Sequence, residues 1–228
     1  MQDDNDSCYL WEDVLNKLIF QIYKQIAFRV DPEKIHDISL VLLEFLYKSF
    51  IGKVLHRKIT KNSREQLNIK FDNPIGLAAG FDKNADYLNF ISNVGFGFVE
   101  VGTLTPKAQS GNPKPRVFRL VNDEAIINHL GFNNKGIDYG IERIKKFNRN
   151  IPIGVNIGKN ASTDVKDAFH DYEYCLRKAY AVADYITLNI SSPNTKDLRE
   201  LQKGEKVSDF LHSIKKLHVN LKKVYKKH

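Results

Sequence analysis

Four short apolar runs of the sequence are each followed by glycine, asparagine, lysine or serine. These polar stretches lie at residues 78–83, 102–103, 156–159 and 189–194. Glycine lets a backbone approach a flat ligand closely, and a lysine just past a strand can bind an anion. Asparagine presents a carbonyl and an amide together, which suits the edge of a uracil-like ring or an isoalloxazine. Each signal alone has an ordinary alternative, because these residue types also form turns and exposed loops.

Other kinds of site are not indicated by the sequence. Ser192 stands before Pro193, which favours an extended backbone, but no Gly-x-Ser-x-Gly elbow surrounds it, so a hydrolase nucleophile is not expected. The histidines lack the spacing of metal ligands, and we expect no metal site. Cys8 and Cys175 are too few for a disulfide framework and indicate a reducing, cytoplasmic setting. Cys175 falls on an apolar helical stripe, so we expect it in the core.

Alternating strand and helix patterns must position the polar stretches. The strand runs are residues 75–79, 97–101, 153–157 and 185–190, and the helical patterns are 84–94, 136–148, 164–181 and 206–224. This alternation predicts a parallel α/β sheet with right-handed crossovers. Each strand run is apolar on both faces or ends in glycine or asparagine, as such a sheet requires. Chemistry at four consecutive strand ends favours a (β/α)8 TIM barrel over a Rossmann sheet. Because only four βα units are present, the sequence predicts the first four units of such a barrel.

The N-terminal part has a different character. Residues 9–50 predict two amphipathic helices, and the second opens with Asp31 as N-cap, Pro32 in the first turn and the acidic Glu33. The expected apolar faces are Trp11, Val14, Leu18, Ile22 and Ile26 in the first helix, and Ile35, Ile38, Leu42, Phe45 and Leu46 in the second. The basic residues that follow are Lys53, Arg57, Lys58, Lys61 and Arg64. We therefore predict a small helical region at 1–66 and half of a barrel domain at 67–228.

No run of the sequence predicts a helix that spans a membrane. The longest apolar run, residues 40–50, is interrupted by Glu44 and Lys48 and is shorter than the ~20 apolar residues that a spanning helix needs.

The net charge of +8 is concentrated near the C-terminus. Residues 202–228 contain eight lysines against two acidic residues. The same segment carries Phe210, Ile214, Leu217, Leu221 and Val224 at helical spacing. We interpret it as an amphipathic helix with a solvated lysine face rather than a nucleic-acid site, and we expect no nucleic-acid partner.

Taken together, the motifs closely resemble those of the class 2, quinone-linked dihydroorotate dehydrogenases. The stretches that carry the resemblance, in the family's order and spacing, are NPIGLAAGFDK at 73–83, GFGFVEVGTLTP at 95–106, GNPKPR at 111–116, GFNN at 131–134, NIGKN at 156–160 and NISSPNT at 189–195. The resemblance runs from about residue 16 to the end of the chain. It implies an FMN flavoprotein that oxidises (S)-dihydroorotate to orotate with a quinone acceptor, in pyrimidine (UMP) biosynthesis.

The resemblance also implies roles for individual residues. The residues implied to contact FMN are Ala78, Ala79, Gly80, Lys83, Thr103, Asn156 and Asn189. The residues implied to hold dihydroorotate are Lys83, Asn128, His129, Leu130, Gly131, Phe132, Asn189 and Asn194. Ser192 would be the catalytic base, where class 1 enzymes have cysteine. Because serine is a poor base at neutral pH, it needs a proton relay and a dry, ordered pocket.

The N-terminal helices resemble the small domain through which the quinone enters on a membrane surface. The family resemblance therefore implies a peripheral protein on the cytoplasmic side of the inner cell membrane. The basic residues between 53 and 64 would suit anionic headgroups.

The sequence departs from the family in two places. Lys196 and Asp197 stand where the family usually has Pro-Gly, so the loop that bears Ser192 is expected to be less stiff. The later strands, with a flavin-contacting lysine and the glycine-rich phosphate loops, are not in this sequence. The chain is therefore expected to be a truncated form. Two alternatives stay open: a non-catalytic remnant or interaction fragment, and a different phosphate-binding barrel enzyme.

Overall fold

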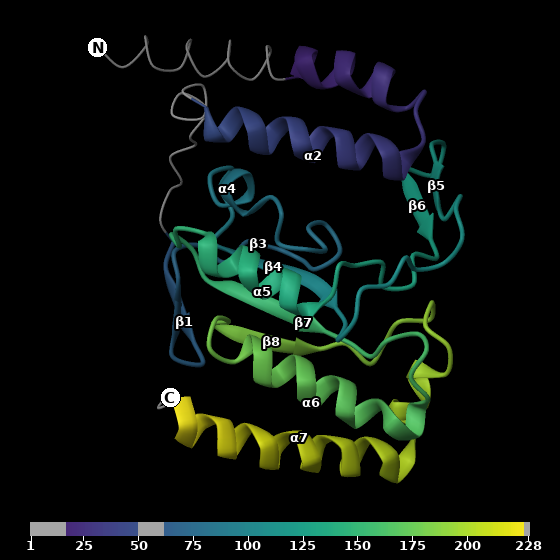
Figure 1. The fold of residues 1–228 in the computed structure, drawn as a ribbon. Helices are drawn as coiled ribbons and strands as arrows, with labels where there is room; N and C mark the ends of the chain where they lie inside the picture. The colour runs from purple at the N-terminus through teal and green to yellow at the C-terminus, as the bar shows by residue number, and fades with distance from the viewer. Residues whose placement is uncertain (1–16, 50–61, 226–228) are drawn as a thin grey trace. The chain divides into compact units, whose positions relative to one another are not determined.

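The computed structural model describes residues 17–49 and 62–225 (Figure 1). They belong to two units. One unit comprises Met1–Leu42 and Val117–Asn128, and the other comprises Leu43–Arg116 and His129–His228. The division at residue 66 stays a prediction. The expectations for Trp11, Val14, Lys53, Arg57, Lys58 and Lys61 fall outside the described residues.

The first unit contains helical residues 17–27, most of α2 (Pro32–Lys48), and an antiparallel hairpin of β5 (Val117–Leu120) and β6 (Ala125–Asn128). The carboxylate of Asp31 accepts a hydrogen bond from the backbone N–H of Lys34 at 2.9 Å, so the predicted N-cap is confirmed. The guanidinium of Arg119 on β5 donates to the carbonyl of Val30 at 3.0 Å, which ties the hairpin to the turn between the helices.

Large apolar side chains of the two helices are exposed rather than buried. They are Leu18, Ile19, Phe20, Ile22 and Ile26 in the first helix and Ile38, Val41, Leu42 and Phe45 in α2. The helical pattern is thus as the sequence predicts, but most of the expected apolar residues face solvent. Within the described residues, no helix is both long enough and apolar enough to cross a membrane.

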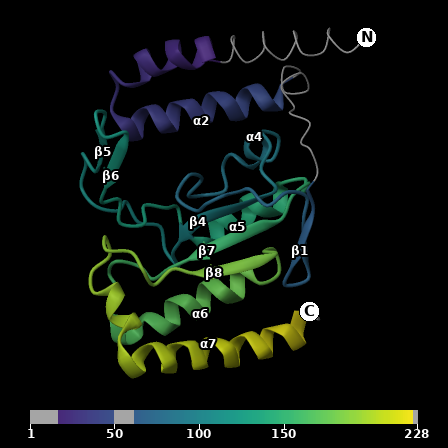
Figure 2. The ribbon, with the colours of Figure 1, turned by 180° about the vertical axis from the view of Figure 1, so that it is seen from behind.

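The second unit is built on four parallel strands in the order β3-β4-β7-β8, as the sequence predicts. The strands are β3 (Gly76–Leu77), β4 (Phe98–Leu104), β7 (Ile153–Ile157) and β8 (Tyr185–Leu188). The intervening and following helices are α4 (Leu88–Ile91), α5 (Ile137–Lys146), η1 (Val165–Asp167), α6 (Ala168–Ala179), η2 (Leu198–Gln202) and α7 (Gly204–Tyr225). Figure 2 shows α6 lying next to β8 and α7 lying beside α6.

A short hairpin precedes the sheet and was not expected from the sequence. It consists of β1 (Arg64–Gln66) and β2 (Ile69–Phe71). Its two turn residues, Leu67 and Asn68, both have positive φ, of 52° and 60°, as a tight two-residue turn requires. The ring of Phe71 packs edge-on against Phe98 at the start of β4, with ring centroids 5.0 Å apart.

The core lies on the face of the sheet that the helices cover. Val99 and Val101 of β4 and Ile153, Val155 and Ile157 of β7 are fully buried against apolar residues of α4, α5, α6 and α7. Cys175 is buried in this core, as predicted. The amphipathic α7 buries Phe210, Ile214, Leu217 and Leu221. Val224 was expected on the same face, but it is 72% exposed because the helix ends one residue later.

The opposite face of the sheet alternates aromatic and polar layers. The ring of Phe98 fills the space above Gly76, and the ring of Tyr185 fills the space above Gly154; a Cβ at either glycine would lie 2.2 Å from the ring. One layer further along, Glu100, Asn156 and Thr187 bring polar side chains together. Their mutual hydrogen bonds make this polar layer tolerable away from bulk water.

Candidate functional site

The ends of β3 and β4 are joined by two backbone hydrogen bonds. The N–H of Gly80 donates to the carbonyl of Gly102 at 2.8 Å, and the N–H of Gly102 donates to the carbonyl of Asp82 at 3.0 Å. Gly80 has φ +103°, and a Cβ placed there would meet nothing within 4 Å. The strand end at Gly80 is therefore fixed in place but open to the outside, as a backbone that contacts a flat ligand must be.

The loop that carries Lys83 is organised by the carboxylate of Asp82. This buried carboxylate accepts backbone N–H bonds from Asn84, Asp86 and Tyr87 at 3.2, 3.0 and 2.8 Å. Burial raises the pKa of Asp82, and the three N–H bonds act in the opposite direction. The ammonium of Lys83 donates to the carbonyl of Gly80 at 2.9 Å. Because these N–H groups donate to Asp82 and Ala85 has φ +60°, the helix expected over 84–94 is reduced to the single turn of α4.

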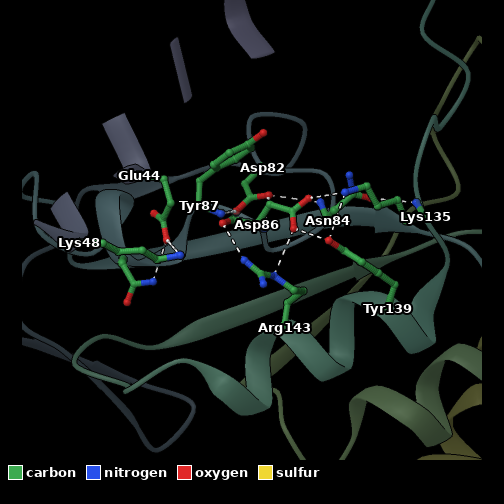
Figure 3. A network of polar contacts seen from close by, with 10 residues as sticks. Glu44, Lys48, Asp82, Asn84, Asp86, Tyr87, Lys135, Tyr139 and Arg143 are labelled. Carbon is green, nitrogen blue, oxygen red and sulfur yellow. Dashed lines mark hydrogen bonds and ion pairs between the residues drawn. The ribbon is translucent and has the colours of Figure 1, made fainter. Parts of the chain in front are cut away.

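A second set of contacts holds the same loop to α5 (Figure 3). The carboxylate of Asp86 pairs with Lys135 at 3.0 Å and with Arg143 at 3.1 Å, and it accepts a hydrogen bond from the hydroxyl of Tyr139 at 2.7 Å. The side chain of Asn84 accepts from the N–H of Lys135 at 2.8 Å. Lys83 thus projects from a loop that is braced on both sides.

Side chains at the ends of β4, β7 and β8 form one chain of hydrogen bonds. The amide of Asn189 donates to the hydroxyl of Thr103 at 3.1 Å, and this hydroxyl donates to the carbonyl oxygen of Asn156 at 2.6 Å. The amide of Asn156 in turn donates to the carboxylate of Glu100 at 2.7 Å. The structure therefore brings together three of the residues that the sequence selected, which are 86 positions apart at the extremes.

The loop after β8 presents Ser192. The N–H of Asn194 donates to the hydroxyl of Ser192 at 3.2 Å, and the amide of Asn112 donates to the carbonyl of Asn194 at 3.3 Å. Asp197 takes the left-handed conformation, with φ +56°, where glycine would be relaxed. The guanidinium of Arg199 and the amide of Gln202 hold the carbonyls of Ser191 and Ile190 at 3.0 and 2.9 Å, which braces the loop despite the departure from Pro-Gly.

The segment from His129 to Phe132 lies against the ends of β4 and β7. The ring of Phe132 and the methyl group of Thr103 pack directly on Gly158, where a Cβ would lie 3.0 and 2.9 Å from them. Gly131 and Phe132 both have positive φ, and their carbonyls accept from the side chain of Gln109 at 3.1 and 3.2 Å. Asn112 fixes the segment's start through the carbonyls of His129 and Leu130, at 2.8 and 3.0 Å.

Most of the selected residues therefore come together at one edge of the sheet in the second unit. Ala78 to Gly80 and Lys83 follow β3. Thr103 and Asn156 are the second-last residues of β4 and β7, and the loop from Asn189 to Asn194 follows β8. Asn128 is the exception, because it ends β6 in the other unit, and its place in the site stays a prediction.

Sequence reasoning missed five residues that shape this edge. They are Glu100, Thr187, Asp82, Asn112 and Thr195. Glu100 carried no local signal, since it lies within a strand and its partners Asn156 and Thr187 are 56 and 87 positions away. The hydroxyl of Thr195 and the side-chain amide oxygen of Asn133 are buried and have no hydrogen-bond partner among the residues that the structure describes. Unsatisfied buried polar atoms next to a cluster of donors fit a site that holds a polar ligand.

The described residues contain no cluster of side chains that could serve as metal ligands. Across residues 17–49 and 62–225, no group of three or more histidine, cysteine, aspartate or glutamate side chains could hold a metal ion. The side chains at the strand ends are instead amides, hydroxyls and one lysine, which recognise a neutral heterocycle with an attached anion.

Comparison with known proteins agrees with this site chemistry. The chain is 47% identical over 206 residues to the dihydroorotate dehydrogenase (quinone) of Psychrobacter arcticus, covering 90% of this chain and 60% of that protein. It is 46% identical over 214 residues to the protein of the same name from Mannheimia succiniciproducens, covering 92% of this chain and 63% of that protein. The chain thus spans about 60% of the length of the curated relatives that it matches.

Solved structures and a family model lead to the same group. A crystal structure of the Eimeria tenella enzyme in complex with ferulenol superposes with a TM-score of 0.74 at 42% identity, covering 84% of this chain and 52% of that one. These structures imply a TIM-barrel fold family. The family model for dihydroorotate dehydrogenase matches residues 63–227, which include every strand of the parallel sheet. The chain therefore belongs to the dihydroorotate dehydrogenase family.

Proposed function

We propose that this chain forms part of a quinone-dependent dihydroorotate dehydrogenase, which oxidises (S)-dihydroorotate to orotate in the biosynthesis of UMP. The observation that carries the proposal is the convergence of Lys83, Thr103, Asn156, Asn189 and Ser192 at one edge of the parallel sheet. In this proposal the four strands are the first four of an eight-stranded barrel, and the remaining length of the relatives supplies the others.

The cofactor of this reaction is FMN, which supplies a hydride acceptor when it is bound. The residues at the strand ends fit its ring system. Gly80 leaves the backbone after β3 uncovered, and Thr103, Asn156 and Asn189 offer hydrogen-bonding groups to the polar edge of an isoalloxazine. Ala78, Ala79 and Lys83 complete the set on the β3 side. The phosphate would be held by loops of later strands, as in other barrels.

Dihydroorotate carries a carboxylate and a cyclic imide. In this proposal the ammonium of Lys83 pairs with the carboxylate, and the side chains of Asn128, Asn189 and Asn194 hydrogen-bond the ring. The positive-φ turn at Gly131 and Phe132 would present backbone groups of residues 129–132 to the same ligand. Because the loop of Lys83 is braced by Asp82 and Asp86, its ammonium would be positioned before substrate arrives.

Ser192 is the proposed base. Its hydroxyl accepts a hydrogen bond from the N–H of Asn194 at 3.2 Å, which fixes the oxygen at a strand end. In the proposed reaction the Ser192 oxygen would take a proton from one ring carbon and pass its own proton to a relay that leads to solvent, while the hydride on the adjacent carbon would leave for the acceptor that bound FMN supplies. The N–H of Asn194 would stabilise negative charge that develops on that oxygen.

The exposed apolar helices support a quinone as the final oxidant. Leu18, Ile22 and Ile26 follow one another at a spacing of four residues on the first helix, and each is more than half exposed. Two helices with such faces are suited to lie in a membrane interface, where quinones dissolve. We propose peripheral attachment on the cytoplasmic side of the inner cell membrane.

The test is an assay of the holoenzyme that contains this chain, with dihydroorotate as donor and a soluble quinone analogue, fumarate or NAD as acceptor. The proposal predicts orotate formation with the quinone analogue and none with fumarate or NAD. Orotate formation only with fumarate or NAD would contradict the quinone assignment. A protein that binds FMN but forms no orotate with any acceptor would favour the non-catalytic alternative.

A further inference from the structure

Glu100 lies at the far end of the hydrogen-bond chain that connects the strand ends. Its two carboxylate oxygens accept from the amide of Asn156 at 2.7 Å and from the hydroxyl of Thr187 at 2.9 Å. Burial raises the pKa of the Tyr185 hydroxyl on the same face, and the negative charge of this carboxylate adds to the effect. Among the described residues the carboxylate forms no ion pair, so neutral donors alone satisfy it.

A carboxylate only accepts hydrogen bonds, and this fixes the direction of the whole chain. Asn156 must turn its amide nitrogen toward Glu100, so its carbonyl oxygen faces Thr103. The Thr103 hydroxyl then donates its single proton to the carbonyl oxygen of Asn156 at 2.6 Å. Toward Asn189 this hydroxyl can therefore only accept, and it accepts from the amide of Asn189 at 3.1 Å. The carbonyl oxygen of Asn189 is left facing the N–H and hydroxyl of Ser191, both at 3.2 Å.

The backbone of Asn189 is held independently of this chain. The buried Tyr172 of α6 donates its hydroxyl to the carbonyl of Asn189 at 2.7 Å, and the N–H of Asn189 donates to Ile157 at 2.9 Å. What Glu100 controls is therefore the orientation of the two side-chain amides, since an amide has nearly the same shape in both orientations.

A fixed direction decides what the strand ends offer to a ligand. Asn156 and Asn189 each have one amide hydrogen left, because the other is used on Glu100 and on Thr103 respectively. Thr103 has no hydrogen left and keeps one lone pair. Two N–H donors and one oxygen acceptor match an imide, in which two carbonyl groups flank one N–H. Flavins and dihydroorotate both contain this group.

We propose that Glu100 is a positioning residue that orients the amides of Asn156 and Asn189 for recognition of an imide edge. This inference rests on the proposed function and adds to it a residue that would touch neither FMN nor the pyrimidine. Glu100 acts only through Asn156, and its effect reaches Asn189 through Thr103.

The test compares wild-type holoenzyme with the Glu100→Gln variant. FMN and orotate carrying carbon-13 at their imide carbonyls are bound in turn, and the carbonyl stretching bands are recorded by vibrational difference spectroscopy. A glutamine at this position both donates and accepts, so the amides lose their single orientation. We expect the labelled bands to move to higher frequency and the affinity for the affected ligand to fall about tenfold. Movement of the FMN bands, the orotate bands or both identifies which imide is recognised, and each outcome supports the proposal.

Two further variants separate orientation from general damage. Glu142→Gln makes the same change on the exposed side of α5, where Glu142 pairs with Lys145 at 2.8 Å, and it is expected to leave bands and affinities unchanged. The pair Glu100→Gln with Asn156→Asp moves the carboxylate one step along the chain, where it again accepts from Thr103. The pair is expected to restore the contact made through Asn189 but not the contact made by Asn156, and it keeps the test decisive if the single variant does not fold.

The outcomes distinguish this inference from the function on which it rests. Wild-type protein that binds neither FMN nor orotate would contradict the proposed function and this inference with it. Wild-type binding together with unchanged bands in Glu100→Gln, or a paired variant with no restored contact, would overturn the role of Glu100 alone.

Discussion

The amide of Asn189 donates to the hydroxyl of Thr103 at 3.1 Å, although β7 separates the strands that carry them. The contact exists because parallel strands bring their carboxyl ends to one edge, so residues far apart in sequence become neighbours. Thr103 is buried, and its hydroxyl also reaches Asn156, so it is the point where three strand ends meet. The proposed flavin contacts are thus one connected unit rather than separate residues.

Asp82 is expected to hold the Lys83 loop in its conformation. The variant Asp82→Ala leaves three backbone N–H groups without the carboxylate that they share. We expect the free energy of unfolding to fall by about 2 kcal/mol and the KM for dihydroorotate to rise more than kcat falls. Denaturant unfolding and steady-state kinetics of the holoenzyme measure the two effects. Asp167→Ala is the matched control, because Asp167 caps α6 without a side-chain hydrogen bond. Equal stability of the two variants would remove Asp82 from this role.

The exposed helices of the first unit are expected to bind membranes. Replacing Ile22 and Ile26 with glutamine removes two apolar side chains that are 53% and 60% exposed. Since burial of such a side chain contributes about 2 kcal/mol, binding to anionic liposomes should weaken tenfold or more. Cosedimentation with liposomes measures this, with Val219→Gln on α7 as the control for a similar change at an exposed apolar site. Equal recovery of the unaltered protein in the supernatant with and without liposomes would contradict membrane binding.

Cys175 is expected to be unreactive in the folded protein. Burial raises the pKa of its thiol far above the ordinary value, because the thiolate would lose its hydration. In a Cys8→Ser background, a thiol-reactive dye at mildly alkaline pH should label the protein only after denaturant is added. Rapid labelling without denaturant would show that the core around α6 opens readily.

The 228-residue chain by itself is expected to bind FMN weakly and to lack dehydrogenase activity. Among the described strands, β8 pairs only with β7, and the groups that the resemblance assigns to the flavin phosphate are outside this sequence. Phosphate contacts at backbone amides and helix N-termini contribute strongly to binding such cofactors. Fluorescence titration with FMN measures the affinity. A soluble monomer that copurifies with stoichiometric FMN and reduces a quinone analogue would contradict this expectation.

The sequence predicted the parallel sheet and the edge where its chemistry lies, because apolar strand runs and polar strand ends are local patterns. It did not predict the β1–β2 hairpin, since Arg64–Gln66 is a fully exposed polar strand without alternation. The helix expected over 84–94 was too long. The backbone N–H groups of Asp86 and Tyr87 donate to the Asp82 carboxylate, so these residues form a loop and not the start of a helix.

The site was predictable in part because some of its residues also belong to local patterns of the sequence. Thr103, Asn156 and Asn189 follow apolar runs and stand out, whereas Glu100 lies within a strand and reads as an ordinary charged residue. Its role depends on Asn156 and Thr187, which are 56 and 87 positions away. No local pattern carries that information.

The most direct measurement is anaerobic stopped-flow reduction of bound FMN by dihydroorotate in the holoenzyme containing this chain, comparing wild type with Ser192→Ala. Because a positioned base contributes about 10²–10⁴-fold to such a proton transfer, the variant should retain its flavin and reduce it slower by about that factor. Ser208→Ala, on the exposed side of α7, should reduce FMN at the wild-type rate. Reduction of FMN in Ser192→Ala at the wild-type rate would contradict the assignment of Ser192 as the base, and absence of reduction in the wild type would contradict the proposed function itself.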